Sequence, residues 1–92
     1  MKVCGKTVVV GKLLTNPVEE DGCTILTIYN INFLMELILA TFWYEGGISS
    51  DAVIKKMRKG DLCRVEGYKH NKKFKSGKLA VIKMTNSEII NR

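Results

Sequence analysis

Apolar positions along this 92-residue chain fall in short runs that are rich in β-branched and aromatic side chains. Runs of this composition are typical of β-strands, and turn signals such as Asn16-Pro17 and Gly46-Gly47 separate them. Gly11 stands where a long first strand could bend or bulge. The pattern predicts five strands, at residues 3–14, 23–31, 36–44, 62–69 and 79–84, with residues 85–92 as the ragged end of the fifth.

The third of these runs, residues 36–44, is apolar on both faces. Helix propensity also allows a helix over residues 33–40, but the β-branched and aromatic side chains of the second half favour a strand. The second apolar face of such a strand must also be shielded from water, either by a ligand or by another copy of the protein. The phase that suits the core best places Ile38, Ala40 and Phe42 inside and Leu37, Leu39, Thr41 and Trp43 outside, although the opposite phase fits almost as well.

Residues 51–59 have the features of a short helix between the third and fourth strands. Ser49, Ser50 and Asp51 supply N-cap chemistry, and Gly60 suits the left-handed position after the helix end. The apolar face consists of Val53, Ile54 and Met57. The cations near its end are explained either by the helix dipole or by contact with a ligand, and the dipole is the simpler account.

Charge changes the picture, because the chain carries a formal net charge of +6 and its calculated pI is about 9.4. Six lysines and no acidic residue lie between Gly67 and Ser87, so this predicted hairpin should attract a polyanion. Tyr68, His70 and Phe74 stand among the lysines, and aromatic rings can stack on unpaired bases while ammonium groups follow the phosphates. The alternative is a solvated, mobile hairpin tip.

The residue types present do not assemble a catalytic site, so we expect no enzyme activity. The chain has one histidine, its paired serines are explained by helix capping, and it has no glycine-rich phosphate loop. Three widely spaced cysteines, Cys4, Cys23 and Cys63, lack a close partner for zinc and are odd in number. They predict small buried side chains in a reducing, cytoplasmic compartment, with no metal and no cofactor.

No apolar run reaches the roughly 18 residues that span a bilayer, and none follows the initial Met-Lys. The sequence therefore predicts neither a signal peptide nor a membrane helix.

Five strands with a short helix between the third and fourth are the element order of an OB-fold, a small all-β Greek-key barrel. At 92 residues, we expect one such domain over the whole chain.

In addition to this element order, two local sequence motifs resemble those of a known protein family. Residues 59–67, KGDLCRVEG, resemble the passage of bacterial single-stranded DNA-binding proteins in which a helix, Lys-Gly, a strand and Glu-Gly follow one another. Residues 11–17, GKLLTNP, are similar to the first strand of that family. The resemblance spans about residues 9–84 and implies a sequence-independent binder of single-stranded DNA in replication, recombination or mobile-element maintenance.

The chain departs from this family at two points. The connection at residues 32–35 leaves no room for the family's long loop between strands two and three, and the chain stops at Asn91-Arg92 without an acidic tail. It is therefore more similar to a stripped form, such as the primosomal replication protein B type or the single-strand binders of phages and mobile elements.

The resemblance also indicates which face binds, because OB-folds use the outer face of strands two and three with the neighbouring loops. It places Leu26 and Ile28 inward and turns Thr27 and Tyr29 outward. In the fourth predicted strand, Cys63, Val65 and Gly67 should point inward, so Arg64 and Tyr68 face the other way. Trp43 is then the best aromatic platform, with a core tryptophan as an equally good alternative. The acidic turn at residues 19–21 should repel phosphate. The predicted nucleic-acid-binding residues are Lys12, Tyr29, Trp43, Arg64, Tyr68, Lys69, His70, Lys72, Lys73, Phe74, Lys75 and Lys78.

A second hypothesis is an OB-type interaction subunit. The apolar third strand would attach it to a replication enzyme, such as a polymerase or helicase, or to itself as a homodimer or larger oligomer. Exposed Leu37 and Leu39 would be its signature. RNA binding ranks third, because the aromatic-rich strands of the cold-shock family are missing, and we expect neither a membrane nor a small-molecule substrate as partner.

Overall fold

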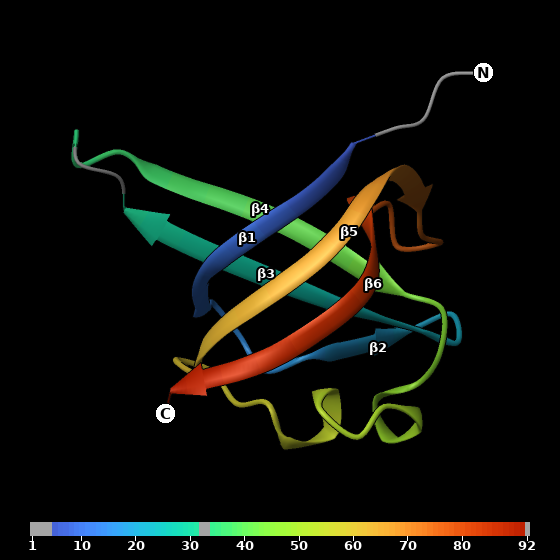
Figure 1. Ribbon diagram of the computed structural model, residues 1–92. Helices are drawn as coiled ribbons and strands as arrows, with labels where there is room; N and C mark the ends of the chain where they lie inside the picture. The colour runs from blue at the N-terminus through green and yellow to red at the C-terminus, as the bar shows by residue number, and fades with distance from the viewer. Residues whose placement is uncertain (1–4, 32–33, 92) are drawn as a thin grey trace.

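The computed structural model describes residues 5–31 and 34–91 of the chain, and strands dominate it (Figure 1). Two single-turn 3-10 helices, η1 (Ile48–Ser50) and η2 (Ile54–Lys56), lie between the fourth and fifth strands. The strands are β1 (Lys6–Leu13), β2 (Val18–Glu20), β3 (Cys23–Ile31), β4 (Leu37–Tyr44), β5 (Leu62–Lys73) and β6 (Leu79–Asn91).

The strands pair in a closed ring. β1 runs antiparallel to β5 from Lys6↔Tyr68 to Lys12↔Leu62, and at its end it also pairs with β3 through Lys12↔Tyr29 and Leu13↔Ile28. β5 pairs with β6, β6 with β4, and β4 with β3, so the last partner leads back to β1 (Figure 1). The β4–β6 pairing is parallel and the others are antiparallel.

One face of each strand fills the ring with apolar side chains. Leu26 and Ile28 of β3 are buried, as are Cys63 and Val65 of β5, so the predicted inward phase of both strands is confirmed. Ile54 of η2 and Met57, which directly follows η2, add two fully buried side chains to the same core. The remaining buried members are Leu13, Phe42, Ile82 and Met84.

Two glycines mark places where neighbouring strands approach closely. A Cβ atom at Gly11 would meet the carbonyl oxygen of Tyr29 and the side chain of Ile28, and one at Gly67 would meet the carbonyl oxygen of Lys83. Only glycine fits such an approach without moving the backbone. Gly11 therefore lets β1 cross closely over β3 at the point where the ring closes.

The predicted α-helix at residues 51–59 is wrong. Asp51 Oδ1 does accept hydrogen bonds from the backbone N–H groups of Val53 and Ile54, at 2.8 and 2.9 Å, but this cap opens only one 3-10 turn. Met57 returns to extended backbone, and Ile54 and Met57 both reach the core. Gly60 has the left-handed conformation predicted for it, with a φ of 91°.

The prediction of five strands misses β2. This short strand pairs antiparallel with β3 from Val18↔Ile25 to Glu20↔Cys23. Asp21 and Gly22 join the two strands with φ angles of 51° and 76°, as a two-residue hairpin turn requires. The acidic segment is thus a hairpin that widens the sheet beyond the end of β1.

The last two strands are longer than predicted. β5 continues to Lys73, and β6 continues past Met84 to Asn91 by pairing with the first half of β5, as in Cys63↔Ile89. Register shifts in this pair allow the long strands to curve around the core. Residues 85–91 of the expected ragged end are therefore part of the sheet, and Arg92 lies outside the described residues.

The β3–β4 hairpin projects beyond the ring (Figure 1). Within the described residues, β4 pairs with β6 at Phe42 and Trp43 and at no earlier position, so Leu37, Ile38 and Leu39 are all exposed. Ile38 was predicted to be a core residue, and this is wrong because the strand leaves the ring before reaching it. Among the described residues, no helix is long and apolar enough to cross a membrane.

Replacing a leucine inside the ring should destabilise the fold far more than replacing one on the projecting hairpin. Leu26→Ala removes a side chain that is 1% exposed and should lower the free energy of unfolding by about 2 to 5 kcal/mol. The matched control Leu39→Ala, at a residue that is 54% exposed, should change it by no more than about 0.5 kcal/mol. Urea denaturation followed by circular dichroism measures both, and equal losses would contradict this description of the core.

Candidate nucleic-acid interface

The tip of the β5–β6 hairpin folds back onto the outer face of β3 and β4. Its turn is closed by two backbone hydrogen bonds, from Phe74 N–H to the Lys78 carbonyl and from Gly77 N–H to the Phe74 carbonyl, both 2.9 Å. The Phe74 side chain is 3% exposed and packs in a second apolar cluster, formed with Cys23, Ile25, Trp43 and Ala80. The expectation of an exposed Phe74 is therefore wrong, because the ring anchors the tip.

Trp43 lies on the outer face of β4, as its predicted phase requires, since it pairs with Ile25 across the sheet. The hairpin tip nevertheless covers it, and only 6% of the residue is exposed. Its indole Nε1–H donates a 2.6 Å hydrogen bond to the backbone carbonyl of His70. The expectation of an open aromatic platform at Trp43 is wrong, and the buried alternative is confirmed, although in a separate cluster from the main core.

Two lysines lie over these buried rings. Lys72 Nζ is 5.6 Å from the centre of the Trp43 ring and 5.3 Å from that of Phe74, and Lys83 Nζ is 5.2 Å from the Trp43 ring centre. Ammonium groups at these distances are attracted to the ring faces. Lys83 was not among the predicted site residues, although it faces Tyr68 across the β5–β6 pair.

Two more rings border the same surface. The exposed His70 packs edge-on against Trp43, with 5.5 Å between ring centres, and the half-buried Tyr68 lies 6.2 Å from His70 at a shallow tilt. We call the group of Tyr68, His70, Lys72 and Lys83 over Trp43 the aromatic–lysine patch. It combines cations with accessible ring surface on the two long strands.

Glu45 is the carboxylate closest to this patch. Its Oε1 lies 3.0 Å from Lys83 Nζ. The hydrogen bond from Lys83, reinforced by its charge, holds the pKa of Glu45 below the ordinary value of 4.5, and the same hydrogen bond raises the pKa of Lys83 above 10.5. Lys83 therefore keeps its charge at neutral pH, and one carboxylate partly neutralises it.

The other predicted lysines of the hairpin, Lys69, Lys73, Lys75 and Lys78, are exposed around the tip. The backbone N–H of Lys75 donates a 3.0 Å hydrogen bond to Asp21 Oδ2, which fastens the tip to the β2–β3 turn. Glu19 Oε1 similarly accepts the backbone N–H of Ile48 at 2.8 Å. Two of the three acids in this turn therefore hold neighbouring loops in place.

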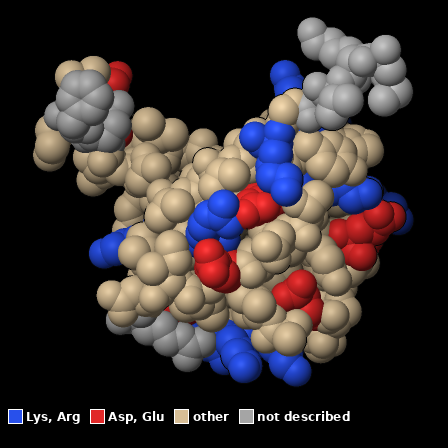
Figure 2. Space-filling model, viewed as in Figure 1, with Lys and Arg blue, Asp and Glu red and all other residues tan. Residues whose placement is uncertain are grey.

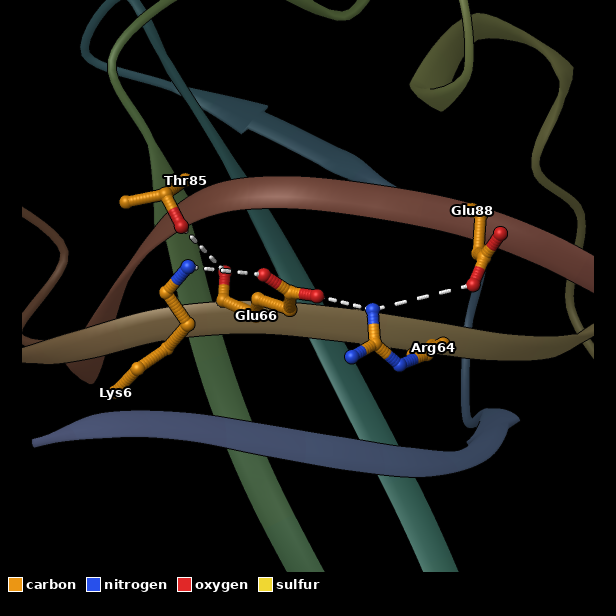
Figure 3. A network of polar contacts seen from close by, with 5 residues as sticks. All are labelled: Lys6, Arg64, Glu66, Thr85 and Glu88. Atoms are coloured by element: carbon orange, nitrogen blue, oxygen red, sulfur yellow. Dashed lines mark hydrogen bonds and ion pairs between the residues drawn. The ribbon is translucent and has the colours of Figure 1, made fainter.

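Arg64 lies apart from the aromatic–lysine patch, on the outer face of β1, β5 and β6. Its guanidinium binds Glu66 and lies 3.9 Å from a carboxylate oxygen of Glu88, while Lys6 reaches Glu66 at 3.2 Å (Figure 3). Hydrogen bonds from Arg64 and Lys6 lower the pKa of Glu66. Blue and red side chains accordingly alternate on this face (Figure 2), so its cations are balanced by acids.

Lys12 and Tyr29 face each other at the β1–β3 pairing, away from the hairpin tip. They line a hollow of about 320 Å³ on the outer surface, together with Val10, Asn30 and Leu62. The twelve predicted site residues are thus divided among the patch and tip, this hollow, and the separate position of Arg64.

Removing the anchor of the hairpin tip should expose Trp43, the one tryptophan of the chain. In Phe74→Ala, we expect the tryptophan emission to shift to the red and its quenching by acrylamide to increase, because the tip no longer excludes water. Leu79→Ala is the control, since Leu79 begins β6 beside the tip and is already 51% exposed. Unchanged emission in Phe74→Ala would show that the tip does not cover the indole.

Comparison with known proteins identifies the fold. No family model matches the sequence, and no curated protein sequence matches it. The mitochondrial single-stranded DNA-binding protein Rim1 of S. cerevisiae superimposes with a TM-score of 0.74 at 14% identity, covering 99% of both chains. The second single-stranded DNA-binding protein of Mycobacterium smegmatis, SSBb, has a TM-score of 0.69 at 20% identity over 96% of this chain and 90% of its own. The chain therefore has the OB-type fold of single-stranded DNA-binding proteins.

Proposed function

We propose that this protein is a single OB-type barrel domain that binds single-stranded DNA without sequence preference and without catalysis, in replication, recombination or mobile-element maintenance. The observation that carries the proposal is the aromatic–lysine patch. There, two cations lie 5.2 to 5.6 Å from the centre of one buried tryptophan ring, beside the rings of Tyr68 and His70. Cations next to stacking surfaces are the combination by which proteins hold unpaired strands.

Each part of the patch has a separate role in this proposal. Tyr68 and His70 offer ring faces for bases, while Lys72 and Lys83 bind phosphates. The buried rings of Trp43 and Phe74 do not stack on bases. They support the two lysines from below, since an ammonium held over a ring loses less side-chain freedom when it meets a phosphate.

The lysines of the hairpin tip extend this surface along the bound strand. Lys69, Lys73, Lys75 and Lys78 are exposed, and the contact between the tip and Asp21 uses the backbone of Lys75, which leaves its ammonium available. Lys12 and Tyr29 supply contacts at the opposite end of the β3 outer face. We leave Arg64 out of the binding surface, because it lies apart from the patch and two carboxylates, those of Glu66 and Glu88, engage its guanidinium.

Binding should be strongly dependent on salt. If about five lysines each neutralise one phosphate, the logarithm of the affinity should fall with the logarithm of the salt concentration at a slope of about −3.5. Lys72→Ala should weaken binding and make the slope less steep by about 0.7, the share of one phosphate contact. Fluorescence anisotropy of a labelled oligo-dT at several salt concentrations measures both quantities.

Lys55→Ala is the matched control for this experiment. It removes the same charge from an exposed lysine of η2, outside the proposed surface, and should leave the slope unchanged. Absence of oligo-dT binding at low salt would refute the proposed function. Stronger competition by RNA of the same length than by DNA would assign the surface to RNA.

A second candidate function is protein interaction through the projecting β3–β4 hairpin. Leu37 and Leu39 are 60% and 54% exposed, which is the signature expected for this role. Glu36 is the one charged residue between Cys23 and Tyr44, and the projecting end is almost entirely uncharged in Figure 2. A bare two-stranded hairpin with apolar side chains on both faces is marginally stable in water, which favours a partner such as a replication enzyme or a second copy.

Self-association through this hairpin should respond to charge placed on it. If the protein forms a dimer or larger oligomer, the double variant Leu37→Arg with Leu39→Arg should sediment as a smaller species, because paired cations cannot be buried against an apolar surface. Leu79→Arg is the control, at an exposed leucine outside the hairpin. A wild-type protein that sediments as a monomer at all concentrations would exclude self-association, and a replication enzyme would remain as the partner to test.

A further inference from the structure

The hollow beside Tyr29 arises from the way in which the ring closes. Within the described residues, β1 pairs with β3 at Lys12↔Tyr29 and Leu13↔Ile28, while its earlier residues pair with β5. The residues of β1 that precede Lys12 therefore diverge from β3. The end of β3 continues into the projecting hairpin. The space of about 320 Å³ between the two strands remains open to solvent.

The lining of this hollow combines apolar walls with two specific polar groups. Val10 and Ile31, 45% and 57% exposed, form walls beside the half-buried ring of Tyr29. Lys12 supplies an exposed ammonium, and none of the described lining residues is acidic. A flat aromatic ligand that carries a negative charge fits these features.

Asn30 adds a group that lacks a partner. Its Nδ2 donates a 3.2 Å hydrogen bond to the Val10 carbonyl, whereas its Oδ1 is buried and has no hydrogen-bond partner among the described residues. Buried acceptors are nearly always satisfied in folded proteins, and an exception calls for an explanation. This oxygen has almost no exposed surface, so a ligand N–H would supply the missing donor only after the Asn30 side chain turns into the hollow.

These features distinguish between two kinds of occupant. An apolar side chain from a second copy could fill the walls, but it would leave Asn30 Oδ1 unpaired and would make no use of Lys12. An unpaired nucleobase has a flat face for Tyr29 and an adjoining phosphate for Lys12, and its N–H could pair with Asn30 Oδ1 once that side chain turns into the hollow. We propose that the hollow binds one base of the single strand, an inference that rests on the proposed DNA-binding function.

The hollow also lies in line with the aromatic–lysine patch. Tyr29 and Ile25 are four residues apart on the outer face of β3, about 13 Å along the strand, and Ile25 pairs with Trp43 beneath the patch. Between them lie the half-buried Thr27 and Thr41, which pair with each other and leave a shallow surface. One strand of DNA can thus occupy the patch and place a base in the hollow, within the 4 to 16 nucleotides typical of one OB-fold.

Filling the hollow tests this inference. Val10→Trp should occupy it with an indole and weaken oligo-dT binding about 5- to 150-fold, the usual effect of losing one stacked base. Val8→Trp is the matched control, because Val8 lies on the same strand, is 46% exposed and is not part of the lining. We expect it to bind within twofold of the wild type in the same anisotropy titration.

Crosslinking gives a second, direct readout. Ultraviolet irradiation of the wild-type complex with oligo-bromodeoxyuridine should attach the strand to the peptide that contains Tyr29, and Val10→Trp should abolish this crosslink while crosslinks near Tyr68 persist. Urea denaturation of both tryptophan variants verifies that they fold.

The outcomes separate this inference from the proposed function. If the wild type binds DNA but Val10→Trp binds equally well and no crosslink forms at Tyr29, the hollow is not a base site and the proposed function stands. A change in sedimentation without a change in DNA affinity would assign the hollow to a second copy and overturn the inference. A wild type that does not bind DNA overturns both.

Discussion

The pairing of β1 with two different strands is the constraint on which the rest of the structure depends. β1 joins β5 along most of its length and β3 at Lys12 and Leu13, and these two contacts close the ring around the core. Gly11 permits the close approach to β3 at this junction. Because the earlier residues of β1 diverge from β3, the same geometry opens the hollow at Tyr29 and leaves the end of the β3–β4 hairpin without a neighbouring strand among the described residues.

A second, smaller cluster determines the character of the candidate interface. The rings of Phe74 and Trp43 are covered when the hairpin tip folds onto β3 and β4, so they cannot stack on bases. Their burial stabilises a hairpin whose six lysines repel one another. The rings remain near the surface, so Lys72 and Lys83 lie over them. In the proposed function, the buried rings hold these cations in place, while Tyr68 and His70 contact the bases.

The distribution of carboxylates explains why only part of the positive charge belongs to the candidate interface. Glu66 and Glu88 form ion pairs with Arg64, and Lys6 also binds Glu66. The positive and negative charges on the outer face of β1, β5 and β6 therefore balance one another. Asp21 and Glu19 accept backbone N–H groups, so the acidic turn supports the basic tip as well as lying near it. Among the described residues, the exposed lysines of the hairpin tip have no such carboxylate partner, whereas Lys83 of the patch pairs with Glu45.

The pattern of the sequence by itself determined the main strands, the inward direction of Cys63 and Val65, and the basic character of the β5–β6 hairpin, while the family resemblance indicated the inward direction of Leu26 and Ile28. These properties are local, because alternation along one strand decides which side chains share a face. Only the tertiary structure decided that Phe74 and Trp43 are covered, that Arg64 is ion-paired and that Lys12 and Tyr29 border a hollow. Each of these features depends on the position of a segment that is distant in the sequence. That position follows from strand pairing between residues far apart in the chain.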